Sequence, residues 1–443
     1  MDQVNPYILI IGCSVIIILS FFFGEISKRT NIPSVLMLIV LGIGLQYGLD
    51  AAGLGGLNFF PALEVLGIIG LIMIVLEAAL ELKLEREKFV SIGKALLVAL
   101  IGLLLSTWAA AEILEYFVPG MDSQRAWLYA TPLSILSSAI IIPSVLGLKG
   151  HKREFHIYES TFSDIMGIML FYFLTAQLPT AYPGPQAEEA VEIVEHTGGG
   201  LLGFAGNVVL TVVVSLIASY AIVLIFQRIR SHVKLFLLIA VLLLLYSVGK
   251  KMHLSSLIIV LIFGLLIANM KLFFRGPLRR FLDYKQALHI YEGLHVVTME
   301  TAFVVRTFFF VIFGVTISLA SLLSVEVAIV SVLIILSIYL IRFVILRIFI
   351  GKDIFPQLFV APRGLITVLL FYAIPTEATV PGFEPGILLF IIIGTSLIMT
   401  FAMVVDKRRA TAALSHARST PVGYERWRAP TLAETVVEEN PEA

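Results

Sequence analysis

A series of apolar runs, each long enough to cross a lipid bilayer, constrains this chain more than any other feature of its sequence. About 20 apolar residues in a helix span the hydrocarbon core of a membrane. Such runs recur along almost the whole sequence, which is 59% hydrophobic and only 14% charged. They predict an all-α polytopic membrane protein of about thirteen spans. We place the spans near residues 6–24, 32–49, 62–80, 90–117, 126–148, 155–177, 201–227, 233–249, 254–272, 297–320, 325–350, 355–376 and 385–405.

Several other classes of protein are excluded or disfavoured by the same sequence. The unbroken apolar runs exclude a transmembrane β-barrel, whose strands alternate polar and apolar residues. A net charge of zero gives no general attraction for nucleic acid. The single cysteine, Cys13, excludes internal disulfides and thiolate metal clusters. The sequence contains neither His-Glu-x-x-His nor Gly-x-Ser-x-Gly, so we expect no enzyme, no cofactor and no bound metal beyond a transported ion.

Lys and Arg residues are unevenly distributed among the predicted loops. Loops that follow odd-numbered spans carry most of them, for example Lys152 and Arg153, whereas loops after even-numbered spans offer Arg125, Lys250 and Lys251. Because positive charge is retained on the cytoplasmic side, this bias predicts an outside N-terminus and a cytoplasmic C-terminus. We therefore expect a multi-pass protein of the plasma (inner) membrane, with lipids as its surroundings.

The polar end of the sequence separates from the membrane region by composition. Residues 407–443 are polar, include three prolines and end in acidic residues, so we expect a disordered cytoplasmic tail there. Residues 1–406 then form the membrane transport domain. The tail indicates no particular soluble protein partner.

Two carboxylates lie within the span at 155–177. Glu159 and Asp164 are energetically unfavourable there, because inserting a charged side chain at mid-membrane costs about 2.5–3.5 kcal/mol on insertion scales. Five helical steps place Asp164 about 140° around the helix from Glu159, so the two face different neighbours. We expect Asp164 to face an ion path near the bilayer midplane and Glu159 to face a structural partner.

The span at 126–148 combines hydroxyl groups with helix-breaking residues at a similar depth. Locally unwound backbone and hydroxyl oxygens can coordinate a dehydrated cation. A kinked helix whose hydroxyls satisfy their own backbone is the alternative, and Asp164 at the same depth favours the ion site. The residues concerned are Thr131, Ser134, Ser137 and Ser138, together with Pro132 and Pro143.

The span at 355–376 is also interrupted, and it contains an arginine. Pro356, Pro362 and Gly364 break its pattern, and Arg363 lies too deep to reach the interface comfortably. A buried guanidinium needs an anion, and we expect Glu159 to supply it. Two interrupted spans of opposite direction, seven spans apart, predict two inverted six-helix repeats, formed by spans 1–6 and 8–13 and linked by the seventh.

At these residues the sequence resembles the cation:proton antiporter superfamily, and most closely its sodium/proton exchanger branch of the NhaP kind (CPA1-type). The resemblance rests on residues 26–45, on L-I-M-I-V-L-E-A-A-L-E-L at 71–82, on E-S-T-F-S-D at 159–164 and on P-R-G at 362–364. It implies an NhaA-like fold with crossed broken helices. It also implies that Asp164 binds the ion and the proton, and that Glu159 and Arg363 form a structural ion pair.

The resemblance further implies a homodimer with a body in two parts. Scaffold and dimer helices would occupy about 1–82 and 233–320, core helices about 90–177 and 325–405, and a linker helix 201–227. The core would carry the ion site between the two faces of the membrane, as in an elevator.

The sequence departs from the family pattern beside the expected site. Ser163 stands where the family has Asn, and Ser137-Ser138-Ala139 stands for its Thr-Asp-Pro, so a second carboxylate is missing. We therefore expect a cation site built from Asp164 and the hydroxyls of Ser160, Ser163, Ser137, Ser138 and Thr131. One titrating carboxylate predicts electroneutral exchange of one cation for one proton.

The expected function is exchange of Na⁺ for H⁺, with Li⁺ or K⁺ as alternative cations. A K⁺/H⁺ antiporter, a cation channel or uniporter, and a non-transporting membrane sensor of ions or pH remain open as other interpretations. A channel would conduct without proton coupling, and a sensor would signal through the tail.

Overall fold

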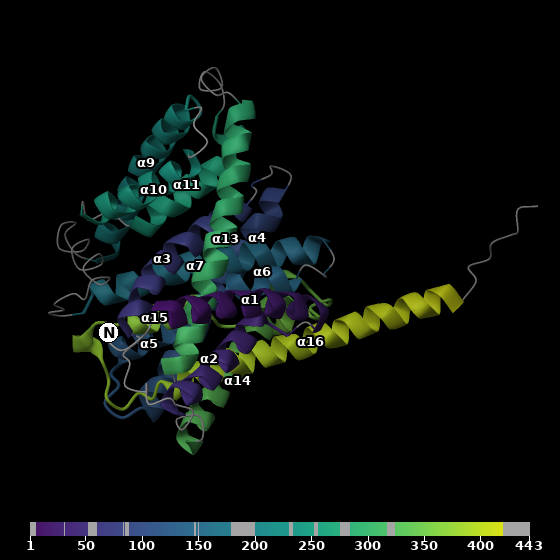
Figure 1. Cartoon of the computed structure of the whole chain (residues 1–443). Coiled ribbons are helices and arrows are strands. Elements are labelled where there is room, and N and C mark those ends of the chain that lie inside the picture. The colour runs from purple at the N-terminus through teal and green to yellow at the C-terminus, as the bar shows by residue number, and fades with distance from the viewer. Residues whose placement is uncertain are drawn as a thin grey trace, which may run out of the picture.

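Helices joined by irregular segments make up the fold of the part of the chain that the structure describes (Figure 1). The computed structural model describes residues 6–30, 32–51, 60–82, 84, 88–145, 148, 150–178, 200–229, 234–251, 256–274, 284–316 and 324–419. These residues contain no β-strand and include eight helices that are long and apolar enough to cross a membrane. The expected all-helical membrane fold is confirmed, whereas the thirteen spans and the inverted repeats stay predictions.

One group of helices is organised around α13 (Tyr284–Thr316). This helix packs against α2 and α3, and α11 packs against α3, α9 and α10 (Figure 1). The other members of the group are α1 (Pro6–Thr30), α2 (Ser34–Ala51), α3 (Phe60–Glu81), α9 (Gly200–Phe226), α10 (Lys234–Lys251), α11 (Ser256–Ala268) and the short α12 (Met270–Phe273).

A second group surrounds α4 (Phe89–Phe117), which packs against α5, α7 and α14. Helix α14 in turn packs against α16, and α3 touches both α7 and α15, so that it links the two groups. The members are α5 (Ser123–Ser134), α6 (Ser138–Ser144), α7 (Gly150–Ala176), α14 (Val325–Phe349), η5 (Gln357–Phe359), α15 (Leu365–Tyr372), η6 (Thr376–Ala378) and α16 (Gly386–Ser419).

Both interrupted spans of the sequence are interrupted in the structure. The first breaks between α5 and α6, where Ile135 and Ser137 have extended backbone. The second runs without helix from Val360 to Gly364, before α15 begins. Pro362 favours this, because proline disfavours helical geometry in the residue before it.

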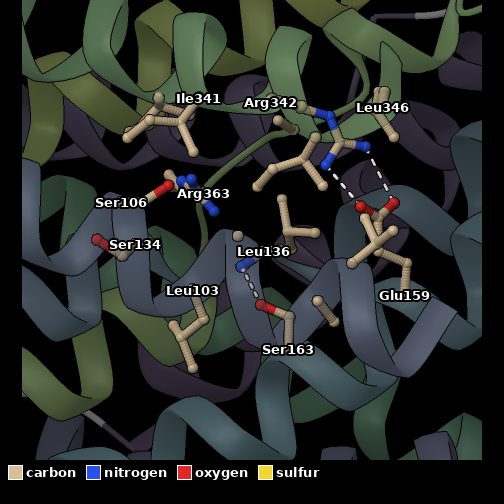
Figure 2. A pocket seen from close by; sticks show the side chains of 16 residues that line it. Leu103, Ser106, Ser134, Leu136, Glu159, Ser163, Ile341, Arg342, Leu346 and Arg363 are labelled. Carbon is tan, nitrogen blue, oxygen red and sulfur yellow. Dashed lines mark hydrogen bonds and ion pairs between the residues drawn. The ribbon is translucent and has the colours of Figure 1, made fainter. Parts of the chain in front are cut away.

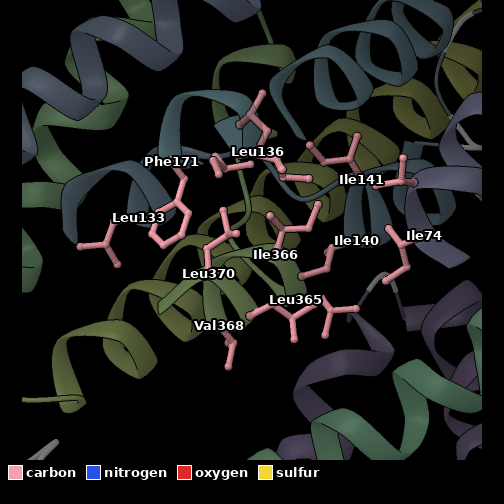
Figure 3. Close-up of a cluster of buried hydrophobic side chains, with 14 of the residues drawn as sticks. Ile74, Leu133, Leu136, Ile140, Ile141, Phe171, Leu365, Ile366, Val368 and Leu370 are labelled. Atoms are coloured by element: carbon pink, nitrogen blue, oxygen red, sulfur yellow. The ribbon is translucent and has the colours of Figure 1, made fainter. Parts of the chain in front are cut away.

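Apolar side chains fix the place where the two interruptions meet (Figure 3). Leu133 and Ile140 from the first span, Leu365 and Leu370 from the second, and Phe171 of α7 are all at most 2% exposed and belong to one core. Inside the bilayer these side chains are held by close packing, because lipid tails are as apolar as they are and burial adds no hydrophobic driving force. The packing therefore holds non-helical backbone inside the protein, as backbone at membrane depth requires.

Two boundaries differ more than the others from those expected. Helix α13 begins at Tyr284 and not near residue 297, because residues 284–296 continue the same helix. Helix α16 continues to Ser419, so disorder from residue 407 is wrong for residues 407–419. That stretch is rich in Ala, Lys and Arg, which favour helix. Its Arg409 lies over the ring of Phe355, 4.5 Å from the centroid. Residues 179–199 and 420–443 lie outside the described residues.

Close contact between α2 and α13 depends on two glycines. A Cβ atom on Gly42 would collide with the Val311 carbonyl oxygen, and one on Gly314 would collide with the Ile39 carbonyl oxygen. Small residues let membrane helices approach this closely.

We expect Gly42→Ala to lower the free energy of unfolding by about 1–3 kcal/mol, the usual range for overpacking. Backbone atoms lie opposite the new methyl group and cannot rotate away. Gly44→Ala is the matched control, because a Cβ there meets nothing within 4 Å. Thermal unfolding of the two detergent-solubilised variants measures the difference, and equal melting temperatures would contradict the packing argument.

Candidate functional site

Asp164 lies on α7 beside the break in the first interrupted span. Its side chain is only 2% exposed. Oδ2 accepts a hydrogen bond of 3.3 Å from the backbone N–H of Ser138, the first residue of α6. Oδ1 is buried and has no hydrogen-bond partner among the described residues. One carboxylate oxygen is thus held by the backbone, whereas the other has no protein partner among the described residues.

The two interruptions cross next to this carboxylate. The N–H of Ser137 donates a hydrogen bond of 2.9 Å to the carbonyl oxygen of Pro362. A Cβ on Gly364 would lie 2.5 Å from Ser137 Oγ, so only glycine permits the observed approach. A Cβ on Gly167 would collide with Ile135, so α7 also lies close against the break. The sequence-based expectation that these segments surround Asp164 agrees with this geometry.

The hydroxyls expected at the site play different parts. Ser138 contributes its N–H to Asp164. Ser163 Oγ accepts a bond of 3.0 Å from Leu136 N–H, as Figure 2 shows. Ser160 donates to the carbonyl of His156 at 2.7 Å, and Thr131 donates to that of Trp127 at 2.8 Å. The structure gives neither Ser160 nor Thr131 a hydrogen bond to Asp164, although both are fully buried.

The expected pair of Glu159 with Arg363 is wrong. Glu159 pairs with Arg342 of α14 through two bonds, Nη1 to Oε1 at 2.7 Å and Nη2 to Oε2 at 3.0 Å (Figure 2). Planar two-bond geometry of this kind is the strongest form of an arginine–carboxylate pair. The expectation that Glu159 takes a structural partner is correct, but its partner comes from a different helix.

Two further groups complete the Glu159 cluster. His156 Nδ1 lies 3.1 Å from Glu159 Oε2, one helical turn away on α7. The carbonyl oxygen of Gln357 accepts bonds from Arg342 Nε at 3.2 Å and Nη2 at 3.1 Å. The cluster therefore ties α7, α14 and the segment before the second interruption together. Sequence reasoning missed Arg342, although an arginine well inside an apolar span is itself a signal for such a role.

Arg363 occupies a different environment from the one expected. It is 2% exposed, and its backbone N–H donates to Thr395 Oγ1 at 3.1 Å. Nε and Nη1 of its guanidinium have no hydrogen-bond partner in the described part of the chain. Its side chain lines a small cavity together with Glu159 and Arg342 (Figure 2).

A second set of charges lies between α3 and α13. Arg306 Nη2 donates to Glu77 Oε2 at 2.9 Å, and His295 lies 3.4 Å from Glu81 Oε1. These pairs connect two helices of the first group. No hydrogen bond or ion pair joins them to Asp164 among the described residues, so we assign them to the α3–α13 contact.

The arrangement around Asp164 suits a small hard cation. Among the described residues no three His, Cys, Asp or Glu side chains gather as a metal-binding cluster. Hydroxyl, carbonyl and single-carboxylate oxygens are ligands for hard ions and not for zinc or copper. A proton and a cation would need the same oxygen of Asp164.

Comparison with known proteins gives two kinds of match. A family model described as sodium/hydrogen exchanger, transmembrane, matches residues 16–406. The solved structure of the sodium proton antiporter MjNhaP1 from Methanocaldococcus jannaschii at pH 8 aligns with a TM-score of 0.63 at 20% identity, covering 91% of this chain and 97% of that one. A structure of the same antiporter from an electron-microscopy map gives 0.61 at 19% identity, covering 96% and 100%. At these identities the structural likeness shows a shared fold.

Proposed function

Because this chain belongs to the sodium/hydrogen exchanger family, a family of membrane transporters and not of enzymes, we propose that it exchanges Na⁺ for H⁺ at Asp164. The observation that carries this proposal is the buried Asp164 carboxylate at the crossing of two interrupted helices, with Oδ1 unpartnered. A proton and a cation exclude one another at that oxygen. Each trip across the membrane then moves one or the other, and this exclusion couples the two flows.

The carboxylate oxygen without a hydrogen-bond partner indicates where the cation binds and which oxygens surround it. Ser138 N–H points at Oδ2, and a cation avoids a positive N–H dipole, so it binds at Oδ1. Ser160 and Ser163 lie on the same helix as Asp164, while Ser137, Ser138 and Thr131 come from the first interrupted span. Their oxygen lone pairs, together with water, replace the missing second carboxylate. No cofactor is needed for this exchange.

An elevator-type movement is supported by the way the helices pack. The residues of the site all lie in the group around α4, whereas α13 organises a separate group, and α3 packs against members of both. We propose that the α4 group is the moving core and the α13 group the scaffold, with α9 as linker. The protein is a multi-pass membrane protein. Insertion in the plasma membrane with the C-terminus inside, and pairing of scaffolds in a homodimer, complete the proposal.

Transport in proteoliposomes that enclose a pH dye tests the exchange directly. External Na⁺ should drive protons out of acidic vesicles, and Li⁺ and K⁺ in separate runs determine the selectivity. Competition for one oxygen predicts that the half-saturating cation concentration rises as pH falls. The limit is about tenfold per pH unit, since one unit changes the proton's free energy by about 1.4 kcal/mol. A half-saturating cation concentration that does not change with pH would refute a shared site.

Exchange of one monovalent cation for one proton moves no net charge. An imposed membrane potential of either sign should therefore leave the direction and extent of exchange unchanged. Movement of one net charge would instead shift the equilibrium by about 2.3 kcal/mol per 100 mV. A current without proton movement would favour the channel or uniporter, and no flux of any tested cation would favour the sensor.

A further inference from the structure

The cavity beside Arg363 lies between α4, α5 and α14 and has a volume of about 30 Å³ (Figure 2). A single water molecule needs about 10–15 Å³ of such space, so the cavity has room for a small ligand. Its polar lining consists of Ser106, Ser134, Ser163, Glu159, Arg342 and Arg363. The remaining walls are aliphatic.

Arg363 forms no ion pair with a carboxylate among the residues that the structure describes. Glu159 is already committed to Arg342 through two hydrogen bonds and lies beside His156. Asp164 accepts from Ser138. An uncompensated guanidinium in the membrane interior is strongly unfavourable. Water would satisfy its N–H groups but would leave its charge unbalanced.

We propose that this cavity binds a small monovalent anion of the halide type, chloride being the most abundant, held by Nε and Nη1 of Arg363. Ser163 already accepts a bond from Leu136, so its own hydrogen can be donated to the anion, as can that of Ser106. Ser134 donates its hydroxyl hydrogen to the Ala130 carbonyl, so it lines the cavity without donating a hydrogen bond to the anion. The limited volume excludes bulky anions such as gluconate.

The anion would give the core a constant charge. Glu159, Arg342 and Arg363 together carry one positive charge, and Asp164 adds none when it holds either a proton or a monovalent cation. This step, unlike the site itself, rests on the proposed function. One bound anion brings these four buried side chains to a net charge of zero in both loaded states, which lowers the penalty for moving them past lipid.

Thermal unfolding of the purified full chain in detergent tests the site. Chloride is titrated against gluconate at constant ionic strength and constant cation, and bromide is used as a second probe. We expect chloride and bromide to raise the melting temperature in a saturable way. Crystals grown in bromide should show an anomalous peak between Arg363 and Ser106.

Variants separate this site from other anion effects. Arg363→Gln should abolish the halide dependence, and Ser106→Ala should raise the half-saturating chloride concentration severalfold, as loss of one hydrogen bond predicts. Arg347→Gln is the matched control, because Arg347 is exposed and contacts the Gly351 carbonyl. If Arg363→Gln does not fold, the half-saturating chloride concentration of Ser106→Ala and the anomalous bromide peak test the proposal instead.

Equal melting curves in chloride and gluconate would overturn the proposal and leave water in the cavity. So would a halide dependence that persists in Arg363→Gln. Asp164→Asn should keep the halide effect, so a failure of the transport proposal would not be mistaken for a failure of this one.

Discussion

Replacing Asp164 by asparagine is expected to reduce proton-coupled cation exchange to the level of liposomes without protein. Asparagine has nearly the same shape and still accepts the 3.3 Å hydrogen bond from Ser138 N–H. It cannot ionise, so it neither releases a proton nor offers a negative oxygen to a cation. The variant should remain folded, because no ion pair is broken and a buried charge is removed.

The control for this experiment is Asp50→Asn. Asp50 is an exposed carboxylate on α2, outside the α4 group. Both variants should purify with unchanged melting temperature, and only Asp164→Asn should lose the dye signal that follows a cation pulse. Exchange that survives in a folded Asp164→Asn protein would remove this carboxylate from the mechanism.

Much of the fold follows from local properties of the sequence. Apolar runs specify membrane helices because the bilayer leaves the backbone no other partners. Pro362 predicts an interruption because proline disfavours helical geometry in the residue before it. Gly364 predicts one because glycine lets another segment of backbone approach closely. Asp164 stands out because a carboxylate in an apolar span is expensive. Each of these inferences needs only the residue and its immediate neighbours.

Pairing of charges was less predictable, because it depends on which helices lie against one another. Glu159 could reach several arginines on depth alone, and the interrupted span containing Arg363 offered the more unusual context. The structure places α14 beside α4 and α7, which brings Arg342 to Glu159 and leaves Arg363 facing a cavity. Residues 407–419 show a similar limit, since polar composition does not prevent a helix from continuing.

The Glu159–Arg342 pair gives the largest stability effect that we expect from any single side chain here. Glu159→Gln should lower the free energy of unfolding by about 3–5 kcal/mol, because Arg342 is then left buried without its anion. Arg342→Gln should cost a similar amount and also removes the two bonds to Gln357. Both side chains are at least nine-tenths buried, so solvent cannot replace the lost partner.

The double variant Glu159→Gln, Arg342→Gln isolates the pair. Removing both charges leaves neither one uncompensated, so the double variant should unfold with a smaller loss than the sum of the two single losses. Arg363→Gln serves as the comparison, because Arg363 shares a cavity with Glu159 but forms no hydrogen bond with it. Combined with Glu159→Gln, it should depart less from additivity than Arg342→Gln does. Thermal and chemical unfolding of the five variants in one detergent measures these differences. Non-additivity for Glu159 with Arg363, and additivity with Arg342, would instead restore the pairing that the sequence first suggested.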